Sequence, residues 1–173
     1  FTINVANTND APVFTSTPTT SAIEDAGYSY TAAASDIDVG DVLSISGEYP
    51  SWLTLIDNGD GTADLSGTPT NDEVGSHSIV LTVTDLEGAT SEQSFTINVA
   101  NTNDAPVFTS TPLTSAVEDA EYSYTMIAED VDEGDGLTYT AQTLPGWLNF
   151  DGTATISGTP TNDNVGDHAV VLL

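Results

Sequence analysis

No lysine, arginine or cysteine occurs anywhere in the 173 residues of this chain. Without cationic side chains the protein cannot neutralise phosphate groups, so we expect no nucleic-acid partner and no contact with anionic membrane surfaces. Without cysteine it has neither disulfides nor thiolate metal ligands. The sequence also lacks a run of about eighteen apolar residues, so it predicts no membrane-spanning helix.

Acidic side chains, in contrast, are abundant. There are 27 aspartate and glutamate residues, and the formal net charge is −27 at pH 7. Because no side-chain ammonium or guanidinium group can pair with them, these carboxylates must be solvated, accept hydrogen bonds or bind cations from the solution. An acidic surface of this kind is common in proteins that are exposed to saline surroundings, so the charge points to such a habitat.

The chain contains a long internal repeat. Residues 1–18 recur letter for letter at residues 95–112. Downstream, a Pro-x-Trp-Leu motif ends at Leu53 and again at Leu148, and Ser-Gly-Thr-Pro-Thr-Asn-Asp follows each of them. The second copy has one residue more before its Pro-x-Trp-Leu motif and four fewer between Trp and Ser-Gly, and such length changes are expected in loops. We therefore predict that the chain is a window on a tandem array of similar domains.

The position of the repeat predicts the domain boundaries. Residues 1–7 would be the last strand of a preceding repeat, 8–101 a complete repeat, and 102–173 a second repeat truncated before its last strand. Within each copy, apolar residues alternate with polar ones, as Phe95 and Ile97 do, and turn residues separate the short runs. No stretch has the apolar period of a helix. The pattern favours an all-β chain of immunoglobulin-like sandwiches with about seven strands each.

Several motifs, taken in order, resemble cadherin repeats. Asn-Thr-Asn-Asp-Ala-Pro-Val-Phe at residues 101–108 resembles the cadherin linker, and Glu24 stands where cadherins have a glutamate in the first strand. The Asp-x-Asp motifs at 36–38 and 130–132 resemble the cadherin Asp-x-Asp. With the Trp-Leu and Ser-Gly-Thr-Pro motifs, the chain is most similar to dystroglycan-type cadherin-like and bacterial Ig-like repeats of large surface adhesins. The resemblance implies tandem cadherin-like β-sandwiches that bind Ca²⁺.

Carried over residue by residue, the resemblance implies two sets of metal ligands. For the intact junction the ligands would be Glu24, Asp72, Asn101, Asn103, Asp104, Asp130 and Asp132. For the upstream half-site they would be Asn7, Asn9, Asp10, Asp36, Asp38 and Asp85. Carboxylate and amide oxygens are the ligands that calcium prefers. Since Asn101 and Ala105 replace an aspartate and an asparagine of the cadherin linker, we expect roughly one or two ions per junction.

Other interpretations of single motifs remain open at this point. Asn-Asp-Ala-Pro is also an ordinary turn, and acidic loops are often only solvated. The Asp-Asn-Gly-Asp-Gly-Thr run at 57–62 favours a hairpin turn over a calcium loop. Trp52 and Trp147 fit a sandwich core better than a sugar platform. His77 and His168 have no nucleophile motif beside them, so we expect no enzyme.

The sequence thus predicts calcium-binding extender repeats of a long extracellular bacterial adhesin or surface filament, with calcium stiffening the junctions. The expected partners are neighbouring repeats of the same polypeptide, and the expected location is the exterior of a bacterium in a saline habitat. One alternative is a glycan-binding module of a polysaccharide-associated protein. Another is a fibre subunit that assembles as a homo-oligomer by strand complementation, with residues 1–5 of one molecule pairing with 168–173 of another.

Overall fold

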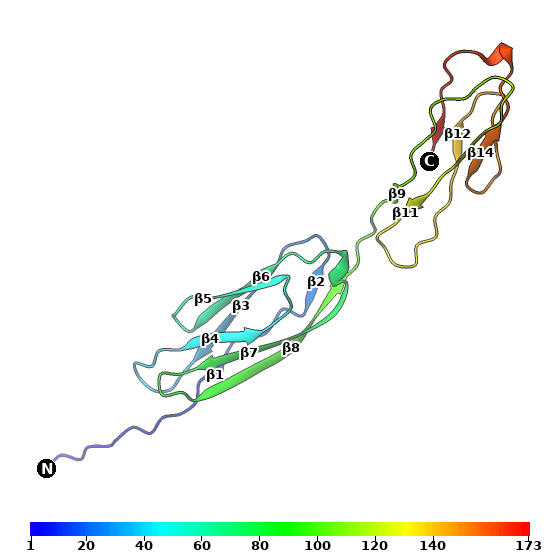
Figure 1. Ribbon diagram of the computed structural model, residues 1–173. Helices are drawn as coiled ribbons and strands as arrows, with labels where there is room; N and C mark the ends of the chain where they lie inside the picture. The colour runs from blue at the N-terminus through cyan, green and yellow to red at the C-terminus, as the bar shows by residue number, and fades with distance from the viewer. The chain divides into compact units, whose positions relative to one another are not determined.

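Strands make up nearly all of the regular structure in the computed structural model, which describes residues 1–173 (Figure 1). The helical elements are two single 3₁₀ turns, η1 (Asn71–Glu73) and η2 (Asn162–Asn164). No helix is long and apolar enough to cross a membrane. The chain divides into unit 1, Phe1–Thr102, and unit 2, Asn103–Leu173. The all-β prediction is confirmed.

Unit 1 is built from two four-stranded sheets. The first has the order β1 (Val13–Phe14), β3 (Tyr28–Ser35), β6 (Thr62–Gly67), β5 (Leu53–Asp57). The second has the order β2 (Ser21–Ile23), β8 (Thr90–Ala100), β7 (Gly75–Thr84), β4 (Ser44–Glu48). All neighbours are antiparallel except β2 and β8, which run parallel. The sequence motif at 57–62 forms the β5–β6 hairpin, as predicted.

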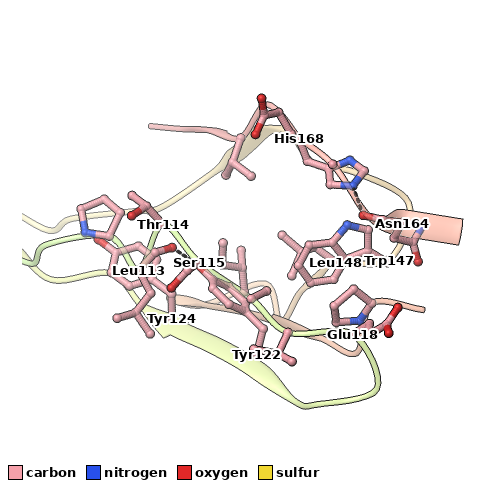
Figure 2. A pocket seen from close by; sticks show the side chains of 18 of the residues that line it. Leu113, Thr114, Ser115, Glu118, Tyr122, Tyr124, Trp147, Leu148, Asn164 and His168 are labelled. Carbon is pink, nitrogen blue, oxygen red and sulfur yellow. Dashed lines mark hydrogen bonds between the residues drawn. The ribbon is translucent and has the colours of Figure 1, made fainter. Parts of the chain in front are cut away.

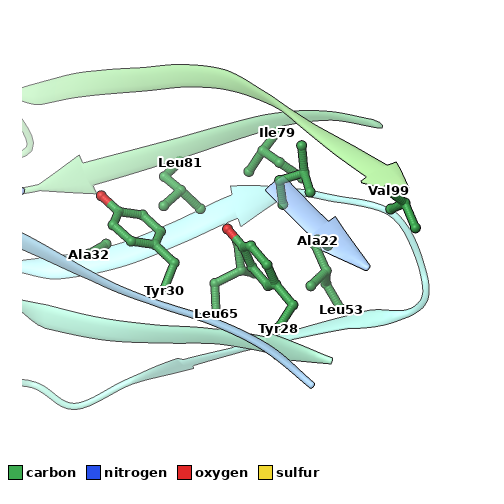
Figure 3. Packing of buried hydrophobic residues seen from close by; sticks show 10 residues of the cluster. Ala22, Tyr28, Tyr30, Ala32, Leu53, Leu65, Ile79, Leu81 and Val99 are labelled. Atoms are coloured by element: carbon green, nitrogen blue, oxygen red, sulfur yellow. The ribbon is translucent and has the colours of Figure 1, made fainter. Parts of the chain in front are cut away.

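Alternation along the strands places the core of unit 1 between the two sheets (Figure 3). In β3, Tyr28, Tyr30 and Ala32 are buried while the residues between them are exposed. Leu65 of β6 and Leu81 of β7 come from opposite sheets, and both are fully buried. Because successive side chains of a strand point to opposite faces, this period of two fills one side of each sheet with apolar groups.

The two tryptophans occupy equivalent places in the two units. Trp52 packs edge-on against Tyr28 and His77, with ring centroids 5.9 and 5.8 Å apart, and lies against the core. Trp147 makes the same contacts with Tyr122 and His168. The indole N–H groups of both are buried. The Trp52 ring therefore takes part in the packing of the core of unit 1, and Trp147 makes the equivalent ring contacts in unit 2.

Unit 2 has shorter strands arranged as three small sheets. The first has the order β10 (Tyr122–Thr125), β14 (Thr155–Gly158), β13 (Asn149–Phe150). In the other two, β11 (Ala128–Glu129) pairs with β9 (Val107–Phe108), and β12 (Ala141–Thr143) pairs with β15 (Val171–Leu172). Its buried core is smaller and centres on Tyr124, Met126 and Ile156.

Candidate metal centre

An acidic cluster lies at one end of unit 1. Carboxylate oxygens of Asp36, Asp41 and Asp85 all lie within 4.8 Å of one another. Asp36 directly follows β3, Asp41 lies in the β3–β4 loop, and Asp85 directly follows β7. The register of the second sheet pairs Ser44 with Thr84, and this pairing brings the loop before β4 next to the end of β7. Strand pairing thus assembles the cluster from segments far apart in sequence.

Two oxygens of this cluster are buried without a hydrogen-bond partner, Asp36 Oδ2 and Asp41 Oδ2. Asp85 is itself buried, with 6% of its surface exposed, and its oxygens are satisfied. Its Oδ1 accepts the N–H groups of Gly88 and Ala89 at 2.6 and 2.7 Å. A buried carboxylate oxygen without a donor is costly unless a positive charge compensates it. The donor chemistry of the cluster therefore fits a cation.

The surroundings of the cluster shift the pKa values of two neighbouring acidic residues, Asp85 and Glu87, in opposite directions. The side-chain hydrogen bond from Asn9, at 2.8 Å, is the main cause that lowers the pKa of Asp85. Glu87 has a raised pKa, first because of partial desolvation and then because of the carboxylates of Asp41 and Asp85. Desolvation disfavours the charged carboxylate, and the neighbouring negative charges act in the same direction.

The linker residues before β1 bind to the same loop. Asn7 Nδ2 donates to Asp38 Oδ1 at 2.7 Å, and the backbone N–H of Asp10 donates to Asp38 Oδ2 at 2.8 Å. The N–H of Asp38 in turn donates to Asp36 Oδ1 at 2.8 Å. With the contact from Asn9 to Asp85, the structure brings together all six residues of the upstream set, Asp10 through its backbone.

Unit 2 repeats part of this arrangement, with Asp132, the counterpart of Asp38, as the third member of its cluster in place of a counterpart of Asp85. Carboxylate oxygens of Asp130, Asp132 and Asp135 lie within 4.8 Å of one another, and Asp132 is buried. The N–H of Asp104 donates to Asp132 Oδ2 at 2.7 Å, and the N–H of Asp132 donates to Asp130 Oδ1 at 3.0 Å. These bonds match those of Asp10 and Asp38 in unit 1. The repeat therefore preserves the acidic loop geometry as well as its sequence.

The other residues of the junction set have varied surroundings. Glu24 is 2% exposed, and its Oε2 accepts the N–H of Thr102 at 3.2 Å. Asp72 is exposed in η1, and Asn101 is exposed directly after β8. Asn103 is also exposed, and its Nδ2 donates to the carbonyl oxygen of Asp104 at 2.6 Å.

Sequence reasoning missed two members of the clusters, Asp41 and Asp135. Each of them stands three residues after the end of an Asp-x-Asp motif and directly follows a glycine. These glycines, Gly40 and Gly134, have positive φ angles of 94° and 96°, respectively. Glycine adopts this left-handed conformation without strain, so it can turn the loop back on itself. The recurrence of Gly-Asp in both copies was the signal that could have found them.

Fold and loops together define the class of this protein: tandem immunoglobulin-like β-sandwiches with clustered acidic groups in their loops. The chain belongs to the family described as "Putative Ig domain", whose model matches residues 11–100 and 105–172. The match is to an immunoglobulin-type family, and the dystroglycan-type cadherin-like assignment stays a prediction.

Among curated proteins, the "Serine-rich adhesin for platelets" of Staphylococcus aureus (strain MRSA252) is 34% identical over 145 residues, covering 73% of this chain and 10% of the adhesin. The chain thus spans about a tenth of the length of that relative. The solved protocadherin GammaB4 extracellular domain has a TM-score of 0.50 and 19% identity, covering 87% of this chain and 27% of that one, a likeness of fold. The endo-fucoidan hydrolase MfFcnA4 from glycoside hydrolase family 107 is 30% identical, with a TM-score of 0.48 and coverage of 94% and 27%.

Proposed function

We propose that this chain is a pair of calcium-binding structural repeats, without enzymatic activity, in a longer extracellular adhesin. The observation that carries the proposal is the pair of buried, unpartnered carboxylate oxygens of Asp36 and Asp41. They lie in a chain that has no lysine or arginine. A cation from solution is therefore the charge that would compensate them.

Calcium suits the donors better than a transition metal does. The clustered side-chain donors are carboxylates, with asparagine amides beside them, and calcium accepts about six to eight oxygen ligands in flexible geometry. Zinc and copper prefer histidine and cysteine. The chain has no cysteine, and His77 is engaged with the carbonyl oxygen of Glu73 at 2.6 Å. A flip of the Asn9 side-chain amide by about 180° would direct its carbonyl oxygen, in place of its NH₂ group, towards an ion.

Ion binding would stiffen the segment that leads into a repeat. Asn9 lies before β1, Asp41 lies between β3 and β4, and Asp85 follows β7, so one ion held among them would cross-link three segments. Without an ion the carboxylates of Asp36, Asp41 and Asp85 repel one another, because their oxygens lie within 4.8 Å of one another. The ion would thus replace a repulsion by a cross-link.

The same proposal applies to the second linker. Its ligands would be the predicted junction residues Glu24, Asp72, Asn101, Asn103, Asp104, Asp130 and Asp132, with Asp135 added from the cluster of unit 2. A calcium-filled linker of this kind would fix the angle between successive repeats. The dystroglycan-type cadherin-like subtype belongs to this proposal, and it is supported by the Pro-x-Trp-Leu and Ser-Gly-Thr-Pro motifs that occur in both copies.

The adhesin context rests on the relatives. The staphylococcal serine-rich adhesin shares 34% identity with this chain, which corresponds to 10% of its length. Repeats that occupy a small part of a long surface protein fit a spacer role, with the neighbouring repeats of the same polypeptide as their partners. An extracellular location follows from this role, and the charge of −27 suits a saline medium.

Small-angle scattering of the intact chain in calcium and in chelator tests the extender role. We expect an extended, rigid particle in calcium and a broader distribution of shapes after chelation. Asp104→Asn should reproduce part of the chelator effect in the presence of calcium. Glu48→Gln, which removes one charge from the exposed end of β4, is the matched control and should behave as the parent chain does. An equally extended and rigid particle after chelation would refute the role.

A further inference from the structure

The first two strands of unit 1 belong to different sheets. β1 pairs with β3 in one sheet, whereas β2 pairs with β8 in the other. The segment between them, residues 15–20, therefore passes from the first sheet to the second. Because β8 is the last strand of unit 1, this crossing segment leads the beginning of the unit directly to its end.

β2 and β8 run parallel, and backbone hydrogen bonds hold both ends of the pair. The N–H of Asn98 donates to the carbonyl oxygen of Thr20, and the N–H of Glu24 donates to that of Ala100, both at 3.0 Å. Tension along the polypeptide would draw the start of β2 and the end of β8 in opposite directions along the strands. Bonds between parallel strands then bear the force together, whereas an antiparallel hairpin pulled at its open end separates one bond at a time.

Gln93 adds a side-chain tie between β8 and the crossing segment. It is partly buried and stands in the same alternate row of β8 as Ile97 and Val99, which face the core. Its Nε2 donates to the carbonyl oxygen of Ser16 at 2.9 Å, and its Oε1 accepts the hydroxyl of Tyr30 at 2.7 Å. One side chain of the last strand thus bonds both to the crossing segment and to β3 of the opposite sheet.

Tyr30 and Ser16 complete a closed network around this tie. Because the Tyr30 hydroxyl donates to Gln93, the Ser16 hydroxyl is the donor in its own contact with Tyr30, at 2.7 Å. Tyr30 is 6% exposed, and its ring packs edge-on against Phe95 with ring centroids 5.6 Å apart (Figure 3). Hydrogen bonds in such an apolar setting are electrostatically stronger than those at a wet sheet edge, and bonds in series reinforce one another.

Part of this network recurs in unit 2. Ser110 Oγ lies 2.7 Å from the Tyr124 hydroxyl, as Ser16 does from Tyr30. The hydroxyl of Tyr122 donates to the carbonyl oxygen of a residue in the equivalent crossing segment at 2.8 Å, and the corresponding bond in unit 1 has the same length. Figure 2 shows Tyr122 and Tyr124 of this unit together. Both copies thus anchor the crossing segment on a pair of tyrosines.

We propose that β2, β8 and the side chain of Gln93 form a mechanical clamp that bears tension along the polypeptide. The inference rests on the proposed function, because repeats within a long surface adhesin are under tension when its two ends are held. Force that enters through the crossing segment passes directly into β8 and leaves after Ala100. Strands β4, β5 and β6 pair with neither β2 nor β8, so they lie outside this path.

Force spectroscopy of the intact chain tests the clamp, with tension applied between its two ends and chelator present so that calcium plays no part. Rupture of unit 1 is recognised by the released length, because residues 13–100 extend to about 300 Å when unfolded. Gln93→Met keeps an unbranched side chain but removes both hydrogen bonds of the amide, and it should speed rupture at constant force about tenfold. Glu92→Gln, on the exposed face of the same strand, is the matched control and should rupture at the parent rate.

Two further variants separate a mechanical role from a general effect on stability. Tyr30→Phe removes one of the two Gln93 bonds, so it should speed rupture by a smaller factor than Gln93→Met does. Leu53→Ala removes a buried core side chain of β5, outside the path of the force. It should lower Tm at least as much as Gln93→Met does, because it leaves a cavity, and yet speed rupture less.

The outcomes also separate the clamp from calcium binding. Equal rupture rates of Gln93→Met and Glu92→Gln would overturn the clamp, as would rupture rates that follow the loss of Tm in every variant. A chain that binds no calcium but shows the Gln93 effect would refute the calcium-binding role and support the clamp. Saturable calcium binding without the Gln93 effect would refute the clamp alone.

Discussion

Gly67→Ala is expected to destabilise unit 1, because Gly67 lies directly under the backbone of Trp52. Gly67 is the last residue of β6, and it pairs with Tyr28 on one side and Leu53 on the other. A Cβ atom added to it would clash with the carbonyl oxygen of Trp52 and lie 3.0 Å from its carbonyl carbon. The turn that carries Trp52 is fixed by the hydrogen bond from Leu53 N–H to the Pro50 carbonyl, at 3.1 Å. The clash is thus with held backbone and not with a flexible side chain.

The size of the effect follows from this geometry. Overpacking costs about 1–3 kcal/mol, and a backbone clash belongs at the upper end of that range. The lower conformational entropy of alanine in the unfolded chain offsets about 0.4–1 kcal/mol. A net loss of about 2 kcal/mol corresponds to a fall in Tm of about 8–16 °C for a domain of this size.

Scanning calorimetry of the intact chain provides the assay, because the two units can melt separately. Gly67→Ala should move one transition, and Gly158→Ala, which meets the Trp147 carbonyl in the same way, should move the other. Gly27→Ala is the control, since nothing lies within 4 Å of its added Cβ. If Gly67→Ala shifts Tm no more than Gly27→Ala does, the packing argument for the Trp and Ser-Gly motifs is wrong.

Two further predictions concern ions and protons. With dissociation constants of about 10⁻⁴–10⁻³ M, 10 mM calcium should stabilise a folded unit by about 1.4–2.7 kcal/mol per ion, and an equal Tm in calcium and in chelator would contradict this. Hydrogen bonds from the N–H groups of Thr155 and Thr153 are the main causes that lower the pKa of Asp151 from 3.8 to about 2. Since the folded pKa is depressed, the stability contributed by Asp151 is present above pH 3.8 and is lost as the pH falls towards 2. A carboxyl NMR titration checks this, and a midpoint near 3.8 would argue against it.

Local patterns in the sequence were sufficient to predict the fold. The alternation of Phe95, Ile97 and Val99 identified one face of β8, because the period of two follows directly from strand geometry. The Asp-x-Asp motif is also local: the N–H of Asp38 bonds to Asp36 Oδ1 two residues away. Short-range hydrogen bonds of this kind depend on few other parts of the chain, so the motifs that form them can be recognised from the sequence.

The acidic cluster itself depends on tertiary structure. Asp41 joins Asp85 because β4 and β7 pair in a register that no local pattern specifies. The raised pKa of Glu87 also depends on tertiary structure, since its causes are desolvation first and then the charge of Asp41, which lies far from it in sequence.

Calorimetric titration of calcium into the intact chain tests the central claim most directly, with Asp36→Asn and Glu48→Gln as paired variants. The account predicts saturable binding with a dissociation constant of about 10⁻⁴–10⁻³ M in the parent chain and in Glu48→Gln. It predicts a clear loss of affinity in Asp36→Asn, whose Oδ2 is one of the two unpartnered buried oxygens. Absence of saturable binding in the parent chain, or equal binding by Asp36→Asn, would contradict the calcium assignment.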